Sequence, residues 1–154
     1  ADRLRACIPY LLPLLDGDHF GFYIYQRIPP LGMVDALTLG PLCDFFHAIP
    51  FSSILFFVAL TLGTRANTGM SRGVRFNAMQ AALLDVFLIF PELIGSSLQG
   101  EDLPLWLLEP CSNFIYYCLM IPVIYCLFQN LVRGKVPNQI PILSEAAELN
   151  IGPY

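Results

Sequence analysis

The sequence predicts an all-α membrane protein with four kinked transmembrane helices and short interfacial helices. Three observations point to this fold class. Hydrophobic residues make up 56% of the 154 residues, and charged residues make up 13%, about half the ~25% usual in soluble domains. The mean hydropathy is +0.61. Two long apolar stretches, 45–63 and 76–94, flank a turn at 64–75 that holds three arginines and no acid.

The first predicted span is an apolar stretch at about 4–25, in which Pro9 and Pro13 should produce kinks. Two interpretations of it stay open. Either one helix continues to Tyr25, or a short helix ends near Asp16 and an interfacial stretch follows. The next residues, 26–44, carry few charges among several apolar side chains, and we expect a loop with a short interfacial helix there.

The second and third predicted spans, 45–63 and 76–94, form a hairpin. Each is 19 residues long, which at about 1.5 Å per residue is enough to cross the ~30 Å hydrocarbon core of a bilayer. Pro50 lies near the start of one and Pro91 near the end of the other. Proline is tolerated inside membrane helices because neighbouring helices satisfy the carbonyl groups that it frees.

The last predicted span is 113–132, with Pro122 at its centre. The connection before it contains Trp106, a residue type that suits the membrane–water boundary. After Lys135 the chain is polar and interrupted by prolines, with a short helix expected at 144–150. The sequence therefore predicts a four-helix transmembrane domain at 1–135 and a polar C-terminal tail at 136–154.

The positions of the basic residues predict the orientation of these spans. With four spans, both termini and the 64–75 turn share one side, and seven of the eight basic residues fall there: Arg3, Arg5, Arg65, Arg72, Arg75, Arg133 and Lys135. Only Arg27 falls on the other side, where most acids lie, including Asp35, Asp44, Glu101 and Asp102. Because basic loops stay on the cytoplasmic side, both termini are predicted on that side or its topological equivalent.

Asp85 is the foremost candidate for a functional residue. It is the tenth residue of its predicted span, near the bilayer midplane, where a charged side chain costs about 2.5–3.5 kcal/mol on insertion scales. Ala78, Ala81 and Ala82 share its helix face, and small residues let another helix approach closely. Asp85 then either bonds to a neighbouring helix, for example to a polar side chain of the last span (Tyr125 or Gln129), or forms a polar wall along a substrate path.

Three more residues are candidates for lining a path or packing helices together. Asp16 lies near mid-depth only if the first helix is continuous, and otherwise caps a helix at the interface. Asn77 and Gln80 precede Asp85 on the same helix, where they either bond to neighbouring helices or line a path. These alternatives stay open.

We find no signature of catalysis, cofactor binding or metal binding. The sequence contains no nucleophile elbow, phosphate-binding loop or HExxH motif, and the five cysteines lack zinc-site spacing. His19 and His47 each stand alone. The basic residues are few and outnumbered by acids, which argues against nucleic-acid binding. The chain is therefore predicted to be non-enzymatic and to need no cofactor.

Three strings carry a resemblance to a known family: RACIPYLLPLLDG at 5–17, IPFSSILFFVALTLG at 49–63 and SRGVRFNAMQAALLD at 71–85. Together they closely resemble the Tic-twenty family, the twenty-kilodalton subunit of the protein translocon at the chloroplast inner envelope membrane. The resemblance covers about 5–134. It implies a multi-pass protein of the inner envelope with four helices and both termini in the stroma. The family motif singles out Arg75, Asn77, Gln80 and Asp85.

The resemblance also implies a function and partners. The family takes part in moving preproteins with transit peptides into the stroma. Its partners are other subunits of the inner-envelope translocon, through them the outer-envelope translocon, and membrane lipid. Three roles stay open for this chain: a subunit that helps to form a preprotein path, a scaffold that assembles the complex without touching substrate, and a small ion or solute carrier that uses Asp85.

Overall fold

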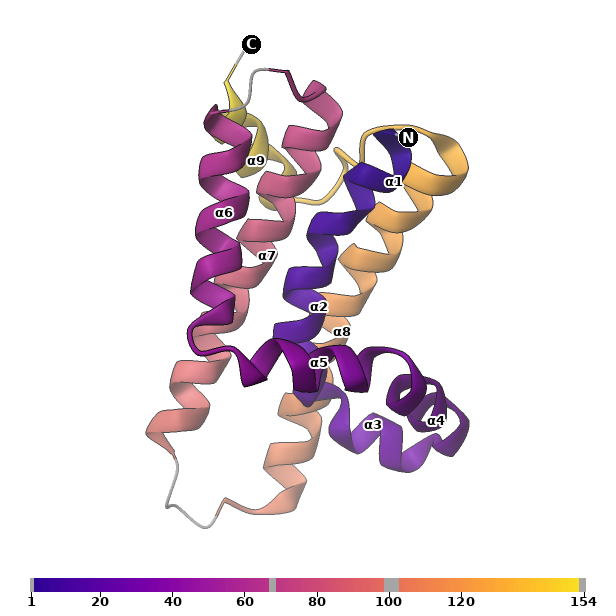
Figure 1. The fold of residues 1–154 in the computed structure, drawn as a ribbon. Helices are drawn as coiled ribbons and strands as arrows, with labels where there is room; N and C mark the ends of the chain where they lie inside the picture. The colour runs from indigo at the N-terminus through magenta and orange to yellow at the C-terminus, as the bar shows by residue number, and fades with distance from the viewer. Residues whose placement is uncertain (1, 67–68, 99–102, 153–154) are drawn as a thin grey trace.

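A computed structural model describes residues 2–66, 69–98 and 103–152, and this part of the chain is helical without any strand. The all-α prediction is therefore confirmed for these residues. The long elements α6 (Ser52–Ala66), α7 (Arg72–Ser97) and α8 (Leu105–Phe128) run side by side with the first helical segment. Two shorter helices, α4 (Pro29–Leu37) and α5 (Leu39–Ala48), lie across them toward one end (Figure 1). Both chain ends lie at the opposite end of the molecule.

The first segment is a chain of short helical pieces. The backbone stays right-handed helical at every junction from Cys7 to Phe22. Proline lacks the N–H that an α-helix needs, and near Pro9 the chain tightens into a 3₁₀ turn. Helical backbone thus passes Asp16, although no single α-helix reaches Tyr25. The pieces are α1 (Asp2–Cys7), η1 (Ile8–Tyr10), α2 (Leu11–Gly17), η2 (Asp18–Gly21) and α3 (Phe22–Arg27).

The predicted second span, 45–63, is not one straight helix. Its first residues belong to α5 (Leu39–Ala48), and α6 (Ser52–Ala66) leaves α5 at an angle of 95°. Pro50 causes this break, because it cannot donate a helical hydrogen bond and it pushes the preceding Ile49 into extended backbone, with φ −90° and ψ 118°. The interfacial region predicted at 26–44 forms a further helix, α4 (Pro29–Leu37).

The two remaining spans are longer than predicted. α7 (Arg72–Ser97) begins four residues before the expected span because the hydroxyl of Ser71 caps it, accepting a 3.4 Å hydrogen bond from the Val74 N–H. α8 (Leu105–Phe128) starts directly after Pro104, so that Trp106 lies on the helix rather than in a loop. A π-helical turn, η3 (Gln129–Arg133), continues α8.

Two helices in the described residues are long and apolar enough to cross a membrane: α7, and α8 together with η3. The bent pair α5–α6 makes a third if it counts as one span. The first segment does not add a fourth by this measure, because its longest single helix has 7 residues. The four-span count therefore stays a prediction.

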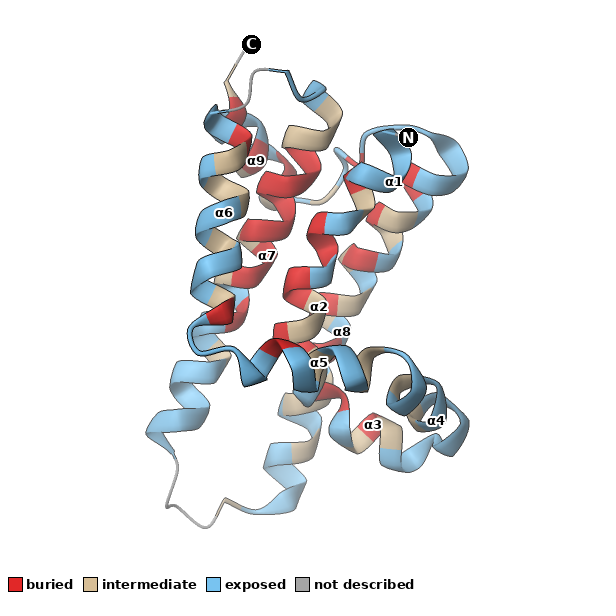
Figure 2. Cartoon of the chain, viewed as in Figure 1, coloured by how far each residue is buried: buried red, intermediate tan, exposed pale blue. Residues whose placement is uncertain are grey.

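The core lies where α7 meets the first segment and α8, and buried residues run along these facing surfaces (Figure 2). Gly17 allows the closest approach, since a Cβ atom at this position would overlap the side chain of Leu119. The expected helix near the C-terminus is α9 (Leu143–Ile151), which packs Ala147 and Ile151 against Phe76 and Met79 of α7.

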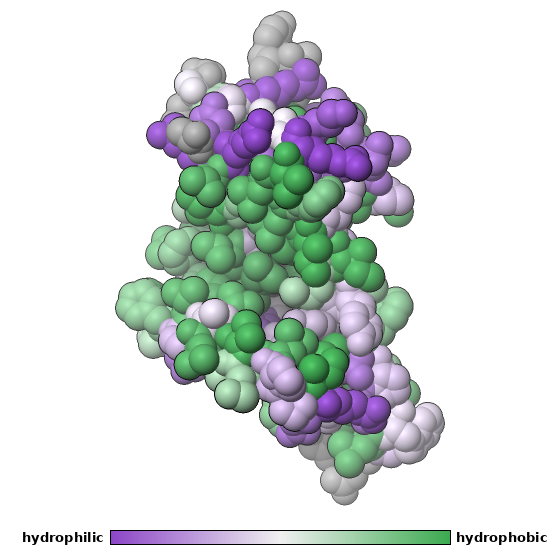
Figure 3. Space-filling view, turned by 90° about the vertical axis from the view of Figure 1, so that its right-hand side faces the viewer, coloured by the Kyte–Doolittle hydropathy of each residue, from purple (hydrophilic) through white to green (hydrophobic). Residues whose placement is uncertain are grey.

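The face of the molecule seen in Figure 3 carries a broad apolar band between a strongly hydrophilic end and an end of mixed polarity. Large apolar side chains are exposed on every long helix, among them Leu55, Phe90, Phe114 and Ile121. Soluble monomers rarely expose apolar patches of this extent. The band is the surface that a helical membrane protein turns toward lipid.

Candidate functional site

Asn77 and Gln80 are fully buried on the face of α7 that meets the first segment. Between them lies the hydroxyl of Tyr10, 2.9 Å from Oδ1 of Asn77 and 3.1 Å from Oε1 of Gln80. The single hydroxyl proton of Tyr10 is shared between these two acceptors. A buried polar contact thus joins α7 to η1.

The two amides also reach the C-terminal half of the chain. Asn130 of η3 donates from Nδ2 to Oδ1 of Asn77 over 2.6 Å, and Asn77 donates back to Oδ1 of Asn130 over 3.2 Å. Gln80 donates from Nε2 to the hydroxyl of Ser144 over 3.0 Å and to the carbonyl of Pro137 over 3.3 Å. Of the two roles left open by the sequence, the geometry of Asn77 and Gln80 is that of bonds to neighbouring helices.

A second polar cluster, which we call the acid–histidine cluster, comprises Asp16, His19, His47, Ser53 and Asp85. Asp85 of α7 lies near Asp16 of α2, and the two residues are only 6% and 7% exposed. Ser53 of α6 donates to Oδ1 of Asp16 over 2.6 Å. Nε2 of His47 lies 3.6 Å from the same oxygen, and Nδ1 of His19 lies 2.9 Å from the backbone carbonyl of Asp16.

This cluster corrects two expectations. The histidines do not stand alone, because both contact Asp16 from different elements. The neighbour of Asp85 is Asp16 rather than Tyr125 or Gln129, and the Tyr125 hydroxyl instead donates to Gln139 over 3.4 Å. The Pro50 bend turns α5 across the foot of α2 and so brings His47 to Asp16, a contact that the spacing of residues in the sequence does not reveal.

The basic residues predicted to set the topology gather at the end that holds both chain ends (Figure 1). Three of them also hold α9. Arg72 pairs with Glu148 at 3.3 Å, Arg65 donates to Asn150 over 3.3 Å, and Arg75 donates to the carbonyl of Ile151 over 3.1 Å, all through their guanidinium groups. Two more basic residues lie just after α8. The Arg133 guanidinium lies 5.7 Å from the centre of the Phe128 ring, and the backbone N–H of Lys135 donates to the Gln129 carbonyl over 3.0 Å.

Acidic residues mark the other end. The Tyr25 hydroxyl donates to Asp18 over 2.7 Å and lies 3.0 Å from the Tyr116 hydroxyl. Partial burial, with the neighbouring charge of Asp18 as a smaller cause, raises the pKa of Asp35 to about 6. Glu101 and Asp102, which were predicted on the same side, lie outside the described residues.

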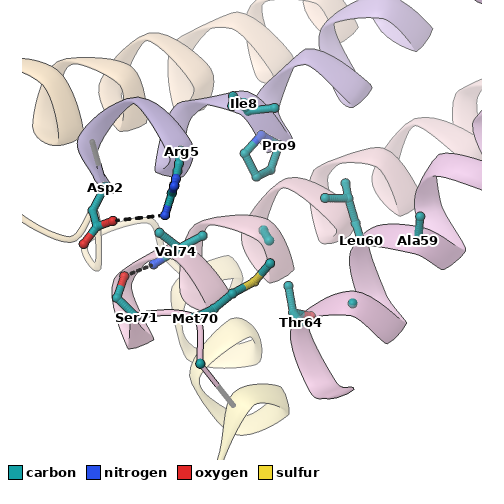
Figure 4. Close-up of a pocket in the computed structure, with 13 residues that line it drawn as sticks. Asp2, Arg5, Ile8, Pro9, Ala59, Leu60, Thr64, Met70, Ser71 and Val74 are labelled. Atoms are coloured by element: carbon teal, nitrogen blue, oxygen red, sulfur yellow. Dashed lines mark hydrogen bonds and ion pairs between the residues drawn. The ribbon is translucent and has the colours of Figure 1, made fainter. Parts of the chain in front are cut away.

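A lateral groove of about 650 Å³ opens between α1 and α6, with α7 as its floor (Figure 4). Its walls are mainly apolar and come from Ile8 and Pro9, from Leu60 on α6, and from Val74 and Ala78 on α7. At the hydrophilic end of the groove Arg5 lies 3.9 Å from Asp2. The groove is open to the side, whereas the amides of Asn77 and Gln80 on the same helix are fully buried.

Comparison with known proteins shows which family this chain resembles in sequence. The family model described as "Chloroplast import apparatus Tic20-like" matches residues 2–147. Protein TIC 20-v, chloroplastic, of Arabidopsis thaliana is 32% identical over 98% of this chain and 71% of its own length. A Tic20 family protein of Synechocystis is 30% identical over 95% of this chain and 90% of its own length. Protein TIC 20-II, chloroplastic, of A. thaliana is 31% identical over 95% of this chain and 70% of its own length.

Proposed function

This chain belongs to the Tic20-like family of the chloroplast import apparatus, and on that premise we propose that it is a membrane subunit of the inner-envelope protein import translocon. In this role it contributes to the movement of preproteins into the stroma. The observation that carries the proposal is the family match over 2–147. The family is that of an import apparatus rather than of enzymes, and the proposed partners are other translocon subunits and preproteins with transit peptides.

The proposed topology has four crossings, made by the first helical segment, α6, α7 and α8, with both termini in the stroma. The clustering of Arg65, Arg72 and Arg75 with α9 at one end supports it, since basic residues favour the stromal side. In this arrangement α4 and α5 lie along the opposite membrane surface, across the direction of the long helices (Figure 1).

The proposed contact surface for a preprotein is the lateral groove between α1 and α6. Asn77, Gln80 and Asp85 are buried in contacts between helices, so they can position the walls of a path but do not face one. The groove, by contrast, is open to the side. A path of this kind is completed by a partner subunit or a second copy of the chain, because the groove is open to one side.

Photocrosslinking in intact plastids tests this role. A crosslinking residue is placed at Ile8 or Leu60 in the groove, or, as a control, at Ile121 on the exposed face of α8. An import-arrested precursor should crosslink from Ile8 and Leu60 but not from Ile121, and the adduct should disappear once import is completed. Crosslinks from the groove only to envelope subunits, while a neighbouring subunit does label the precursor, would instead assign the chain a scaffolding role.

A further inference from the structure

The acid–histidine cluster brings together titratable groups from several elements around one buried carboxyl. Asp85 faces Asp16 from α2, and Glu92 lies further along α7. His19 from η2 and His47 from α5 also lie near the pair, and Ser53 of α6 adds a hydroxyl. Both histidines of the chain are therefore in this cluster.

The closeness and burial of the two acids favour one proton between them. Two ionised carboxylates that face each other repel, whereas one proton lets the first donate to the second. Asp16 already accepts from Ser53 and faces His47, so it is the natural acceptor. Oδ1 of Asp85 is buried and has no hydrogen-bond partner, and Asp85 lies deep in a membrane-spanning helix, where a charge is costly.

The surroundings of His47 give this proton a route to water. The His47 side chain is 53% exposed. Its Nδ1 lies 2.9 Å from the carbonyl of Cys43, and because a carbonyl can only accept, this nitrogen carries a proton. Nε2 is then the ring nitrogen without a fixed hydrogen-bond acceptor on the backbone, and it is the one that faces Asp16. Asp16 lies between His47, which is open to solvent, and Asp85, which is not.

We propose that Asp16 and Asp85 form a proton-binding site within the membrane part of the protein, filled from the α5 side through His47. A proton leaves Nε2 of the His47 imidazolium for the carboxylate of Asp16 and then moves to the carboxylate of Asp85. Neutral His47 regains a proton from water on the α5 side. This inference goes beyond the import role and does not depend on it, since it rests on contacts within this chain alone.

Infrared spectroscopy of the purified full chain in liposomes tests the site directly. The C=O stretch of a buried carboxylic acid is recorded in H₂O, and its hydrogen–deuterium exchange is followed after transfer to D₂O. The wild-type chain should show this band, and Asp85→Asn should lose it while Asp85→Glu keeps a carboxylic acid band. Persistence of the unchanged band in Asp85→Asn would overturn the assignment.

The two histidines provide a matched pair of variants for the route. His47→Gln should slow exchange of the buried acid by about a hundredfold, the lower part of the range that a positioned proton-transferring side chain contributes. His19→Gln should slow the exchange much less than His47→Gln does, because Nδ1 of His19 lies against the backbone carbonyl of Asp16 and not against its carboxylate. Exchange at the wild-type rate in His47→Gln would overturn the route. If Asp85→Asn fails to fold, Asp85→Glu and this pair of histidine variants still decide the question.

Discussion

Asn77 occupies the centre of a fully buried hydrogen-bond network. Its Oδ1 accepts hydrogen bonds from the Tyr10 hydroxyl and from Nδ2 of Asn130, and its Nδ2 donates to the Gly73 carbonyl over 2.7 Å. In a low-dielectric interior, removing one member leaves its partners without hydrogen bonds, and that loss rather than the bond itself sets the energetic cost. Asn77 is therefore a stability determinant whatever the substrate of the protein.

Asn77→Leu should destabilise the protein by about 1–3 kcal/mol, because the Asn130 amide stays buried without its partner and the Tyr10 hydroxyl keeps only Gln80 as an acceptor. The measurement is the free energy of unfolding in detergent. Asn113→Leu on α8 is the matched control, since Oδ1 of Asn113 already lacks a partner and its loss should cost much less. Equal destabilisation by the two substitutions would contradict the proposed network.

Hydropathy singled out the polar residues of the candidate site but not their partners. Asp85, Asn77 and Gln80 stand out in the sequence because each interrupts an apolar run. The partners Tyr10 and Ser144 lie 70 and 64 residues from Gln80, and His47 reaches Asp16 only through the Pro50 bend. Such pairings depend on how the helices pack and are not encoded in local periodicity.

Close approach of α2 to α8 depends on the absence of a side chain at Gly17. Gly17→Ala should destabilise the fold by about 1–3 kcal/mol, because the new methyl overlaps the buried Leu119 and the core must shift. Gly95→Ala in α7 is the matched control. Nothing lies near its Cβ position, so the substitution should be neutral or stabilise the helix by up to about 1 kcal/mol. The measurement is the thermal unfolding temperature of both variants. A Gly17→Ala protein as stable as the wild type would argue against this packing.

Docking of α4 should depend on pH through Asp35. The pKa of Asp35 rises from an ordinary 3.8 to about 6 in the folded protein, so the folded state binds this proton more tightly. Its stabilising contribution is full below about pH 4 and is lost as the pH rises through 6. Hydrogen exchange of α4 amides, corrected for intrinsic rates, should show weaker protection at pH 7 than at pH 4.

Asp35→Asn should remove this pH dependence, and Asp44→Asn on the exposed surface of α5 should keep it. An unchanged pH dependence in Asp35→Asn would show that other groups control the docking of α4.

The sequence predicted the helices of the chain but not where each one begins and ends. Proline at 50 ends α5, and the Ser71 cap and Pro104 set where α7 and α8 begin, so local features moved boundaries that hydropathy alone placed elsewhere.

At the scale of the whole molecule, charge separates the two ends. Arg65, Arg72 and Arg75 lie with α9 at one end, and Asp18 and Asp35 lie at the other. The apolar band lies between these ends (Figure 3). The arrangement matches the charge pattern from which the sequence predicted the orientation, and it leads to a direct test in membranes.

Single cysteines in an otherwise cysteine-free chain should report this orientation. In intact inner-envelope vesicles with the stromal side enclosed, Asp44→Cys should react with a membrane-impermeant maleimide, and Ser71→Cys should react only after the membrane is permeabilised. Both positions are exposed in the structure, so reactivity reports the side of the membrane rather than burial. Labelling of Ser71→Cys in intact vesicles would contradict the proposed orientation.

Co-isolation with a precursor tests the import role most directly. Plastids that carry an affinity-tagged copy of the chain import a precursor arrested partway, and the tagged chain is purified in mild detergent. We predict that the precursor and other envelope translocon subunits are recovered with it, and that the precursor is lost from the complex once import is completed. Recovery of the chain without precursor or translocon subunits, from membranes in which another subunit retains the precursor, would contradict the proposed function.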